Sequence, residues 1–174
     1  MTTTSANNTH EATPAAAPGV RRDEEAVSAT EAARATPGWD NLTPGTTCPP
    51  LTDRPITRTD IVQYQGASGD LNPIHHDEEF ARAAGFPTVF VVGMLPAGIL
   101  ANYVADWLGP ANVRRFAVQF REQAWPGDQL TYSAKVVGRR EEGGERLVDL
   151  ELLVTRQTGG VHLKGTATFA VPRD

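Results

Sequence analysis

One segment of the sequence, residues 94–108, is apolar on nearly every side of the helix that it would form; it reads MLPAGILANYVADWL. A helix that is apolar all round belongs in the interior of a protein. Pro96 fits in the first turn of this helix, and Gly109 followed by Pro110 ends it. The sequence therefore predicts a buried helix over residues 94–108, and the other elements have to pack around it.

After residue 110 the apolar residues recur at every second position, in four runs separated by turn residues. This alternation is typical of strands that bury one face. The runs are Phe116, Val118 and Phe120; Leu130, Tyr132, Ala134 and Val136; Val148, Leu150, Leu152 and Val154; and Val161, Leu163, Ala167 and Phe169. We expect an antiparallel meander of these strands. Together with the buried helix, it predicts an α+β fold in which a curved antiparallel sheet wraps a long central helix.

Two short helices are predicted before the buried one. Thr57 or Thr59 can cap the first, which should end at Gly66. Asp77 can cap the second, since acidic residues fill its first turn and Gly85 lies just beyond its end. The segment between these helices is therefore expected to be a loop.

Residues 1–50 differ in composition from the rest of the chain. They are rich in Thr, Ala, Pro, Glu and Asn and hold few large apolar side chains. Such a segment buries too little apolar surface to offset the entropy lost on ordering. We predict a disordered tail over residues 1–50 and a folded domain over residues 51–174, with Trp39 and Leu42 as possible contacts between them.

Length, charge and cysteine content narrow the class of protein. A chain of 174 residues suits one domain with a substantial core. The net charge of −5, without a basic stripe, argues against nucleic acid as a partner. Cys48 is the only cysteine, which excludes an intrachain disulfide and fits a reducing compartment. Neither a signal peptide nor a membrane-spanning apolar run is evident, so we expect a cytoplasmic protein.

The loop between the two short helices places a carboxylate and an imidazole five residues apart, at Asp70 and His75. Gly69 permits a turn before Asp70, while Pro73 fixes its own φ and keeps Asn72 out of the helical region. Such side chains exchange protons near neutral pH, and catalytic residues are frequent on loops of defined shape. The pair is therefore a candidate for general acid–base catalysis.

Gly93 directly precedes the buried helix. Free amide groups and the helix dipole favour negative charge at a helix N-terminus, and a glycine lets a carbonyl oxygen approach closely. The amide of Gly93 is therefore a candidate to stabilise an oxyanion, with a glycine that merely starts the helix as the alternative.

The other candidates also have structural explanations. Asp70 can form a turn with its own backbone, and His75 can be a buried, hydrogen-bonded histidine. His76 competes with His75 as the reactive imidazole, although it reads better as the solvated start of the second helix. A metal site at His75, His76 and Asp77 is disfavoured, because adjacent residues rarely face one ion and no further His or Cys lies at ligand spacing.

Three stretches of the chain resemble the MaoC-like, or (R)-specific enoyl-CoA hydratase, family of hot-dog-fold enzymes. The family pattern Asp-x-Asn-Pro-(Ile/Leu)-His is met by Asp70, Asn72, Pro73, Ile74 and His75. Two further stretches follow in the family's order: Gly85–Phe86 with Val92–Leu95, and Phe120–Arg121 with Pro126–Asp128. The chain departs from the pattern at Val92, where the family usually has His.

The resemblance implies a hot-dog fold and the reversible hydration of a trans-2-enoyl thioester to an (R)-3-hydroxyacyl thioester. In the family, the positions of Asp70 and His75 act on the reacting water, and the amide at Gly93 holds the thioester oxygen. Asn72 and Met94 are then expected to bind the substrate, with Asn72 orienting either the loop or the thioester tail. The resemblance also implies an acyl-CoA or acyl-carrier-protein substrate, no cofactor, and a homodimer or a heterodimer with a related hot-dog chain.

Two other functions remain open on this scaffold. An acyl thioesterase would attack the thioester carbon in place of C3, which the spacing of Asp70 and His75 argues against. A non-catalytic subunit of a heteromeric dehydratase would bind acyl-CoA unchanged. Val92 in place of the usual His is the only support for the second.

Overall fold

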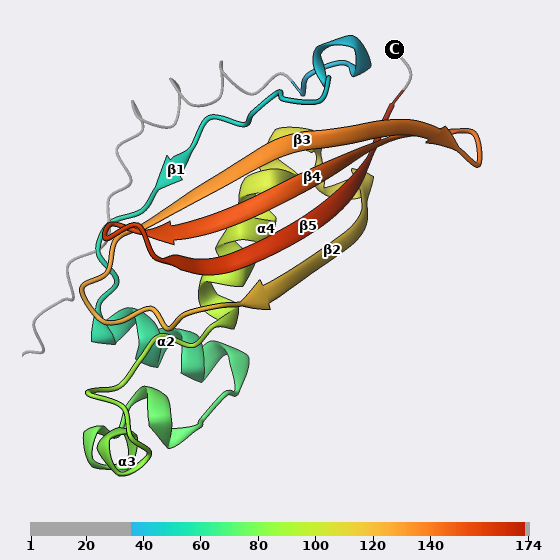
Figure 1. The fold of residues 1–174 in the computed structure, drawn as a ribbon. Helices are drawn as coiled ribbons and strands as arrows, with labels where there is room; N and C mark the ends of the chain where they lie inside the picture. Colours follow the sequence, from blue (N-terminus) through green and yellow to red (C-terminus); the bar gives the residue numbers. More distant parts are fainter. Residues whose placement is uncertain (1–35, 173–174) are drawn as a thin grey trace, which may run out of the picture. The chain divides into compact units, whose positions relative to one another are not determined.

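The computed structural model describes residues 36–172, in which one long helix lies across a face of an antiparallel sheet (Figure 1). Helix α4 spans Met94–Leu108, which confirms the predicted helix and its bounds. Leu100, Val104 and Leu108 of α4 join the buried strand residues in one hydrophobic core. The central helix and the sheet around it are therefore arranged as the sequence predicts.

Helix α4 is not buried on every side, as its composition had suggested. Its buried residues are Pro96, Ala97, Leu100, Tyr103, Val104 and Leu108. Gly98 and Asn102 are exposed, and the side chain of Met94 is 54% exposed. The single chain thus leaves part of an apolar helix in contact with solvent.

The sheet has five strands in the order β1-β3-β4-β5-β2. The strands are β1 (Leu51–Thr52), β2 (Val113–Phe120), β3 (Leu130–Glu142), β4 (Glu145–Arg156) and β5 (Val161–Val171). The hairpins β3–β4 and β4–β5 confirm three strands of the predicted meander. The first strand of the predicted meander, β2, lies elsewhere than expected. It pairs with β5 at the edge of the sheet, and not with β3. Residues 121–129 carry the chain from one side of the sheet to the other, so the turn at 126–128 belongs to no hairpin.

The ordered domain begins before Leu51, which corrects the predicted boundary. Leu42 is fully buried and Cys48 nearly so, and both belong to the hydrophobic core. Thr47 forms a bridge to Lys135 of β3, directly ahead of the short strand β1. Residues 1–35, which make up most of the predicted tail, lie outside the described residues.

Two short helices precede α4, as predicted. Helix α2 (Arg58–Ser68) is capped by Thr57, whose hydroxyl accepts from the amide of Asp60. It continues past Gly66, where we expected its end, and stops at Gly69, which adopts the left-handed conformation with φ of 75°. Helix α3 (Glu78–Ala83) is capped by the predicted residue, the carboxylate of Asp77.

Within the described part of the chain, no helix has the length and apolar character that crossing a membrane requires.

Candidate active site

The loop between α2 and α3 carries the predicted motif, and a buried glutamine fixes its shape. Gln65 of α2 donates from Nε2 to the backbone carbonyls of Asp70 and Asn72, at 2.8 and 3.1 Å. Its Oε1 lies 3.1 Å from Nδ1 of His76. One side chain thus holds three points of the loop. Gln65 was not predicted as a site residue, because nothing in its sequence position marks it as more than a helix residue.

Two side chains of the motif also make local turns. The amide of Asn72 donates to Oδ1 of Asp70 at 3.3 Å, and the amide of Ile74 donates to Oδ1 of Asn72 at 3.1 Å. The second bond caps the short 3₁₀ helix Pro73–His75. Asp70 therefore forms the turn that its structural explanation proposed, and it is also exposed at a cavity. The amide of Asn72 is engaged in shaping the loop.

His75 is 8% exposed and its ring is oriented by a backbone carbonyl. Nδ1 lies 2.8 Å from the carbonyl oxygen of Phe90, which can only accept, so Nδ1 carries the proton. Nε2 then holds a lone pair that can accept a proton. The Phe90 ring packs edge-on against the imidazole, with ring centroids 4.9 Å apart. His76 is exposed and turned to Gln65, which favours His75 as the reactive histidine.

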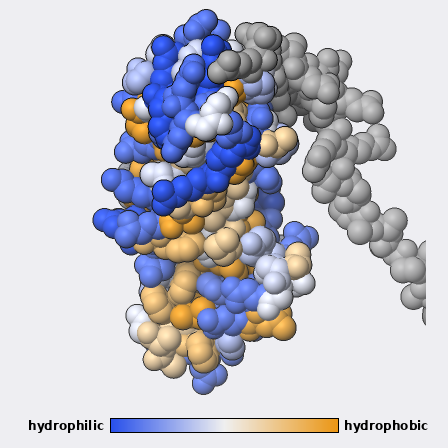
Figure 2. Space-filling model, turned by 90° about the vertical axis from the view of Figure 1, so that its right-hand side faces the viewer, coloured by the Kyte–Doolittle hydropathy of each residue, from blue (hydrophilic) through white to orange (hydrophobic). Residues whose placement is uncertain are grey.

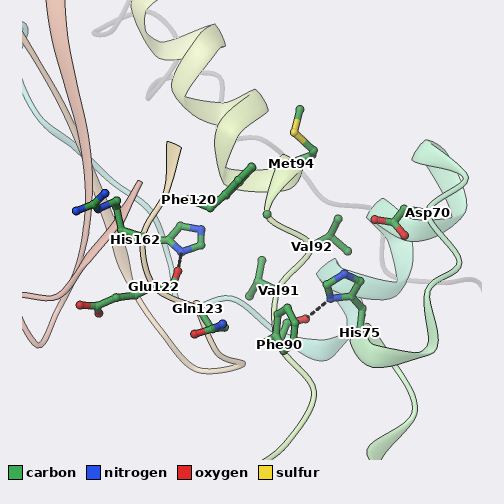
Figure 3. Close-up of a pocket in the computed structure, with 12 residues that line it drawn as sticks. Asp70, His75, Phe90, Val91, Val92, Met94, Phe120, Glu122, Gln123 and His162 are labelled. Carbon is green, nitrogen blue, oxygen red and sulfur yellow. Dashed lines mark hydrogen bonds between the residues drawn. The ribbon is translucent and has the colours of Figure 1, made fainter. Parts of the chain in front are cut away.

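Asp70 and His75 line one cavity of about 380 Å³, a size that suits a small-molecule ligand. Figure 3 shows the two side chains on one side of this cavity, with Phe120, Glu122 and His162 on the other. Gly93 and Met94 of the predicted site also line it, whereas Asn72 does not. The structure therefore brings together four of the five predicted residues, and the fifth shapes the loop.

Gly93 starts α4 at the wall of the cavity. The first amides of a helix have no partner within the helix, so they are available to an oxygen in the cavity. A Cβ at Gly93 would lie 2.6 Å from Cε1 of Phe120, so the aromatic ring packs directly against the glycine backbone. Val92 is buried beside it and also lines the cavity.

Residues 120–123 and His162 complete the cavity wall, and an ion pair between the buried Asp128 and the partly buried Arg156 supports the segment that follows. Asp128 is 4% exposed and accepts from the amide of Trp125 at 2.8 Å, from Nε of Arg156 at 2.7 Å and from Nε2 of Gln157 at 2.9 Å. Burial raises the pKa of the Asp128 carboxyl, but these donors outweigh burial and leave the pKa below its ordinary value. From the sequence, Asp128 stands out only as the last residue of the Pro126–Asp128 stretch that resembles the family.

Among residues 36–172, no three His, Cys, Asp or Glu side chains are grouped so that they could hold a metal ion.

Comparison with known proteins identifies the family. A family model described as MaoC like domain matches residues 41–158, which is most of the described chain. The chain belongs to the MaoC-like family. Its named relatives are hydratases and dehydratases of acyl thioesters, which supports hydration or dehydration chemistry in general.

Two curated relatives illustrate the range of this MaoC-like family. The (R)-specific enoyl-CoA hydratase of Rhodospirillum rubrum is 32% identical over 124 residues, which cover 67% of this chain and 81% of the relative. The mitochondrial 3-hydroxyacyl-[acyl-carrier-protein] dehydratase FERN of Solanum lycopersicum is 26% identical over 119 residues, which cover 68% of this chain and 72% of the relative.

Solved structures confirm the hot-dog fold. The (R)-hydratase from A. caviae involved in PHA biosynthesis has a TM-score of 0.66 and 25% identity, covering 75% of this chain and 98% of that one. The ChsH1–ChsH2 complex from Mycobacterium tuberculosis has a TM-score of 0.65 and 24% identity, with the same two coverages, and shows likeness of fold alone.

Proposed function

We propose that this MaoC-like chain adds water reversibly across a trans-2-enoyl thioester to give an (R)-3-hydroxyacyl thioester. The observation that carries this proposal is the meeting of Asp70, Nε2 of His75 and the N-terminus of α4 at one cavity. The names of two relatives, an (R)-specific enoyl-CoA hydratase and a 3-hydroxyacyl-carrier-protein dehydratase, support the same reaction in its two directions.

In this mechanism one water molecule lies between Asp70 and His75. The carboxylate and the unprotonated Nε2 both accept hydrogen bonds from the water, whose oxygen attacks C3 as one proton is removed. The protonated pair then delivers a proton to C2, so that one water has been added in total.

Negative charge develops on the thioester oxygen as C3 is attacked. In the proposed mechanism the amide of Gly93, at the start of α4, donates to this oxygen, and the helix dipole adds to the stabilisation. Met94 lines the cavity beside it and would contact the bound thioester, while Asn72 acts indirectly through the shape of the loop. The thiol carrier is either CoA or an acyl-carrier protein.

The proposed working form is a dimer, with an identical or a related hot-dog chain. Strand β2 is an edge strand, and one side of the apolar helix α4 is open to solvent. Exposed apolar side chains on or near these elements include Met94, Val113 and Phe120. Hydrophobic residues also gather in the lower part of the face shown in Figure 2, below a hydrophilic upper part. One solved structure of the same fold is a complex of two different chains.

The test is an absorbance assay on the purified protein with crotonyl-CoA and a longer enoyl-CoA. Hydration removes the conjugated-enoyl absorbance without releasing free thiol, and Asp70→Asn should abolish this loss. Release of thiol would make the chain a thioesterase instead. Binding of acyl-CoA without turnover, unchanged in Asp70→Asn, would make it a non-catalytic subunit.

A further inference from the structure

His162 is a buried histidine for which the proposed hydration has no use. It is 2% exposed at the start of β5, and it lines the same cavity as Asp70 and His75. Figure 3 places it across the cavity from that pair, beside Phe120 and Glu122. A polar side chain in this position is in reach of whatever molecule fills the cavity.

An irregularity in the sheet directs this side chain. Val154 of β4 pairs with Leu163, whereas the next residue, Thr155, pairs with Val161. His162 is therefore an extra residue between two paired positions, which is a β-bulge. Regular alternation would place His162 and Leu163 on opposite faces, one of them exposed, but both are buried here. Bulges bend a strand and redirect a side chain in this way, often next to active sites.

The two ring nitrogens of His162 have different surroundings. Nδ1 lies 2.6 Å from the carbonyl oxygen of Glu122, which can only accept, so Nδ1 carries the proton. Nε2 is buried and has no hydrogen-bond partner among the described residues. Burial lowers the pKa of the imidazole below its ordinary value, which favours the neutral ring near pH 7. Nε2 is thus an unused acceptor.

A buried acceptor without a partner is unusual, because almost all such groups in proteins are hydrogen-bonded. Figure 3 shows the free side of the His162 ring turned away from the carbonyl of Glu122, towards Phe120 in the wall of the cavity. The donor that Nε2 lacks among the described residues would come from a molecule that enters the cavity beside Phe120.

We propose that Nε2 of His162 accepts a hydrogen bond from an N–H or O–H group of the bound thioester and thereby selects among substrates. The inference rests on the proposed function, since it takes an acyl thioester as the molecule in the cavity. Such a molecule has two sources of a donor: the first amide of the pantetheine arm, and a hydroxyl group on the acyl chain.

The arrangement of the cavity favours the pantetheine amide. With C3 of the substrate at Asp70 and His75, the thioester oxygen lies at Gly93, which packs against Phe120. Phe120 is on the His162 side of the cavity, so the sulfur and the arm beyond it would run towards His162. The experiment nevertheless includes both sources.

Two pairs of substrates, measured with the wild-type protein, identify which substrate group is the donor. The first pair is crotonyl-N-acetylcysteamine and the crotonyl thioester of 2-acetoxyethanethiol, which differ only in N–H against O. The second pair is an enoyl-CoA with a terminal hydroxyl group and its counterpart with a methyl group in place of that hydroxyl. We expect kcat/KM to favour the donor-bearing member of one pair by about tenfold or more. The pair that shows the preference identifies the source.

Variants then assign the preference to His162. His162→Asn can keep a donor for the carbonyl of Glu122 but places no acceptor where Nε2 was, so the preference should disappear. Tyr132→Phe is the matched control, because it also removes a buried polar atom without a partner but at a different, smaller cavity. The control should keep the preference.

The proposal is overturned if the wild type prefers neither donor, or if His162→Asn keeps the preference. The wild-type comparison needs no variant, so it decides even if His162→Asn does not fold. Calorimetric titration with the saturated butyryl analogues of the first pair and the corresponding saturated acyl-CoA pair separates this inference from the proposed reaction. If the two members of a pair bind unequally but no substrate is turned over, the proposed hydration is wrong and the role of His162 stands. If substrates are turned over but both members of each pair have equal kcat/KM and equal affinity, the role of His162 is wrong and the hydration stands.

Discussion

The imidazole of His75 is held by the backbone of Phe90, whose carbonyl oxygen lies 2.8 Å from Nδ1 and whose ring packs edge-on against it. Phe90 is in the segment that leads into α4 and Gly93. The orientation of the histidine and the start of the helix are therefore set by one short stretch of chain. Because a backbone carbonyl orients the ring, substitutions of His75 can remove Nε2 while keeping or removing the group that donates to that carbonyl.

Comparison of His75→Asn with His75→Ala should separate the effect of His75 on activity from its effect on stability. An asparagine amide can still donate towards the Phe90 carbonyl, but neither residue offers the acceptor Nε2. We expect both variants to lose about 10²–10⁴-fold in kcat, as for the loss of a general base. The alanine variant should also lose about 0.5–1.5 kcal/mol of stability, because the partly buried Phe90 carbonyl loses its donor. Enoyl absorbance and urea denaturation measure the two effects, and near-wild-type turnover in either variant contradicts the mechanism.

Asp70→Asn should remove activity with little change in stability. Its Oδ1 can still accept from the amide of Asn72, so the turn persists, and the residue is exposed. We expect kcat to fall by about 10²–10⁴-fold while the thermal midpoint stays close to that of the wild type. Glu79→Gln, which neutralises an exposed carboxylate outside the cavity, is the control and should retain full activity. A loss of activity that merely follows unfolding would remove the support for Asp70 as a catalytic group.

Gly93→Ala and Gly98→Ala compare two glycines of the same helix region. The backbone of Gly93 has φ of −56°, which alanine can adopt, and the nearest obstacle to its Cβ is the ring of Phe120, at 2.6 Å. We expect crowding at the thioester oxygen and a fall in kcat of about tenfold or more. Nothing lies within 4 Å of a Cβ at Gly98, so Gly98→Ala should keep its activity and gain up to about 1 kcal/mol of stability. Equal activity of the two variants would show that the site tolerates contact at Gly93.

Replacing Phe120 by a smaller residue tests the contact between Phe120 and position 93 from the Phe120 side. If Phe120 is what alanine at position 93 meets, Phe120→Leu should restore part of the activity lost in Gly93→Ala. The rate of the double variant is compared with both single variants in a mutant cycle. Strictly additive losses would locate the effect of Gly93→Ala elsewhere.

Asp128 should make stability depend on acid pH. Its pKa is lower in the folded state than in the unfolded chain, so its stabilising effect is present at neutral pH. That effect is lost as the pH falls below the ordinary Asp pKa of about 3.9 and through the lower value of the folded state. Asp128→Asn should cost about 2–4 kcal/mol at pH 7, because Arg156 and two further donors lose a carboxylate. Urea unfolding of both proteins at pH 7, 5 and 3 should show this difference shrinking towards pH 3; a constant difference contradicts the assignment.

Much of the fold could be predicted from local sequence patterns, and the errors of that prediction have physical causes. The helix at 94–108 and the hairpin strands were predictable because apolar periodicity reports directly on burial. Periodicity says which face of a strand is buried but not which strand lies beside it, so the pairing of β2 with β5 was missed. Cys48 was assigned to the tail because composition averages over a long segment and hides single core residues, whereas Leu42 was expected to contact the domain and lies in its core.

The candidate site shows the same division. Asp70, His75 and Gly93 could be proposed from the sequence because each stands in a motif or at a helix end, where the sequence carries a local signal. Gln65 and Asp128 act through contacts with residues that the sequence does not mark as their neighbours. His162 gave no signal because it interrupts the alternation of β5, and a bulge depends on the register of two strands.

The bulge at His162 also bears on how such a site can change over generations. Since Val161 and Leu163 already have partners in β4, loss of the single residue between them would leave an uninterrupted ladder and the same core contacts beyond it. Deletion or insertion of one codon would therefore remove or add a polar side chain in the cavity wall without shifting the register of β5 against β4. Substrate preference in this architecture can evolve by length change as well as by point substitution.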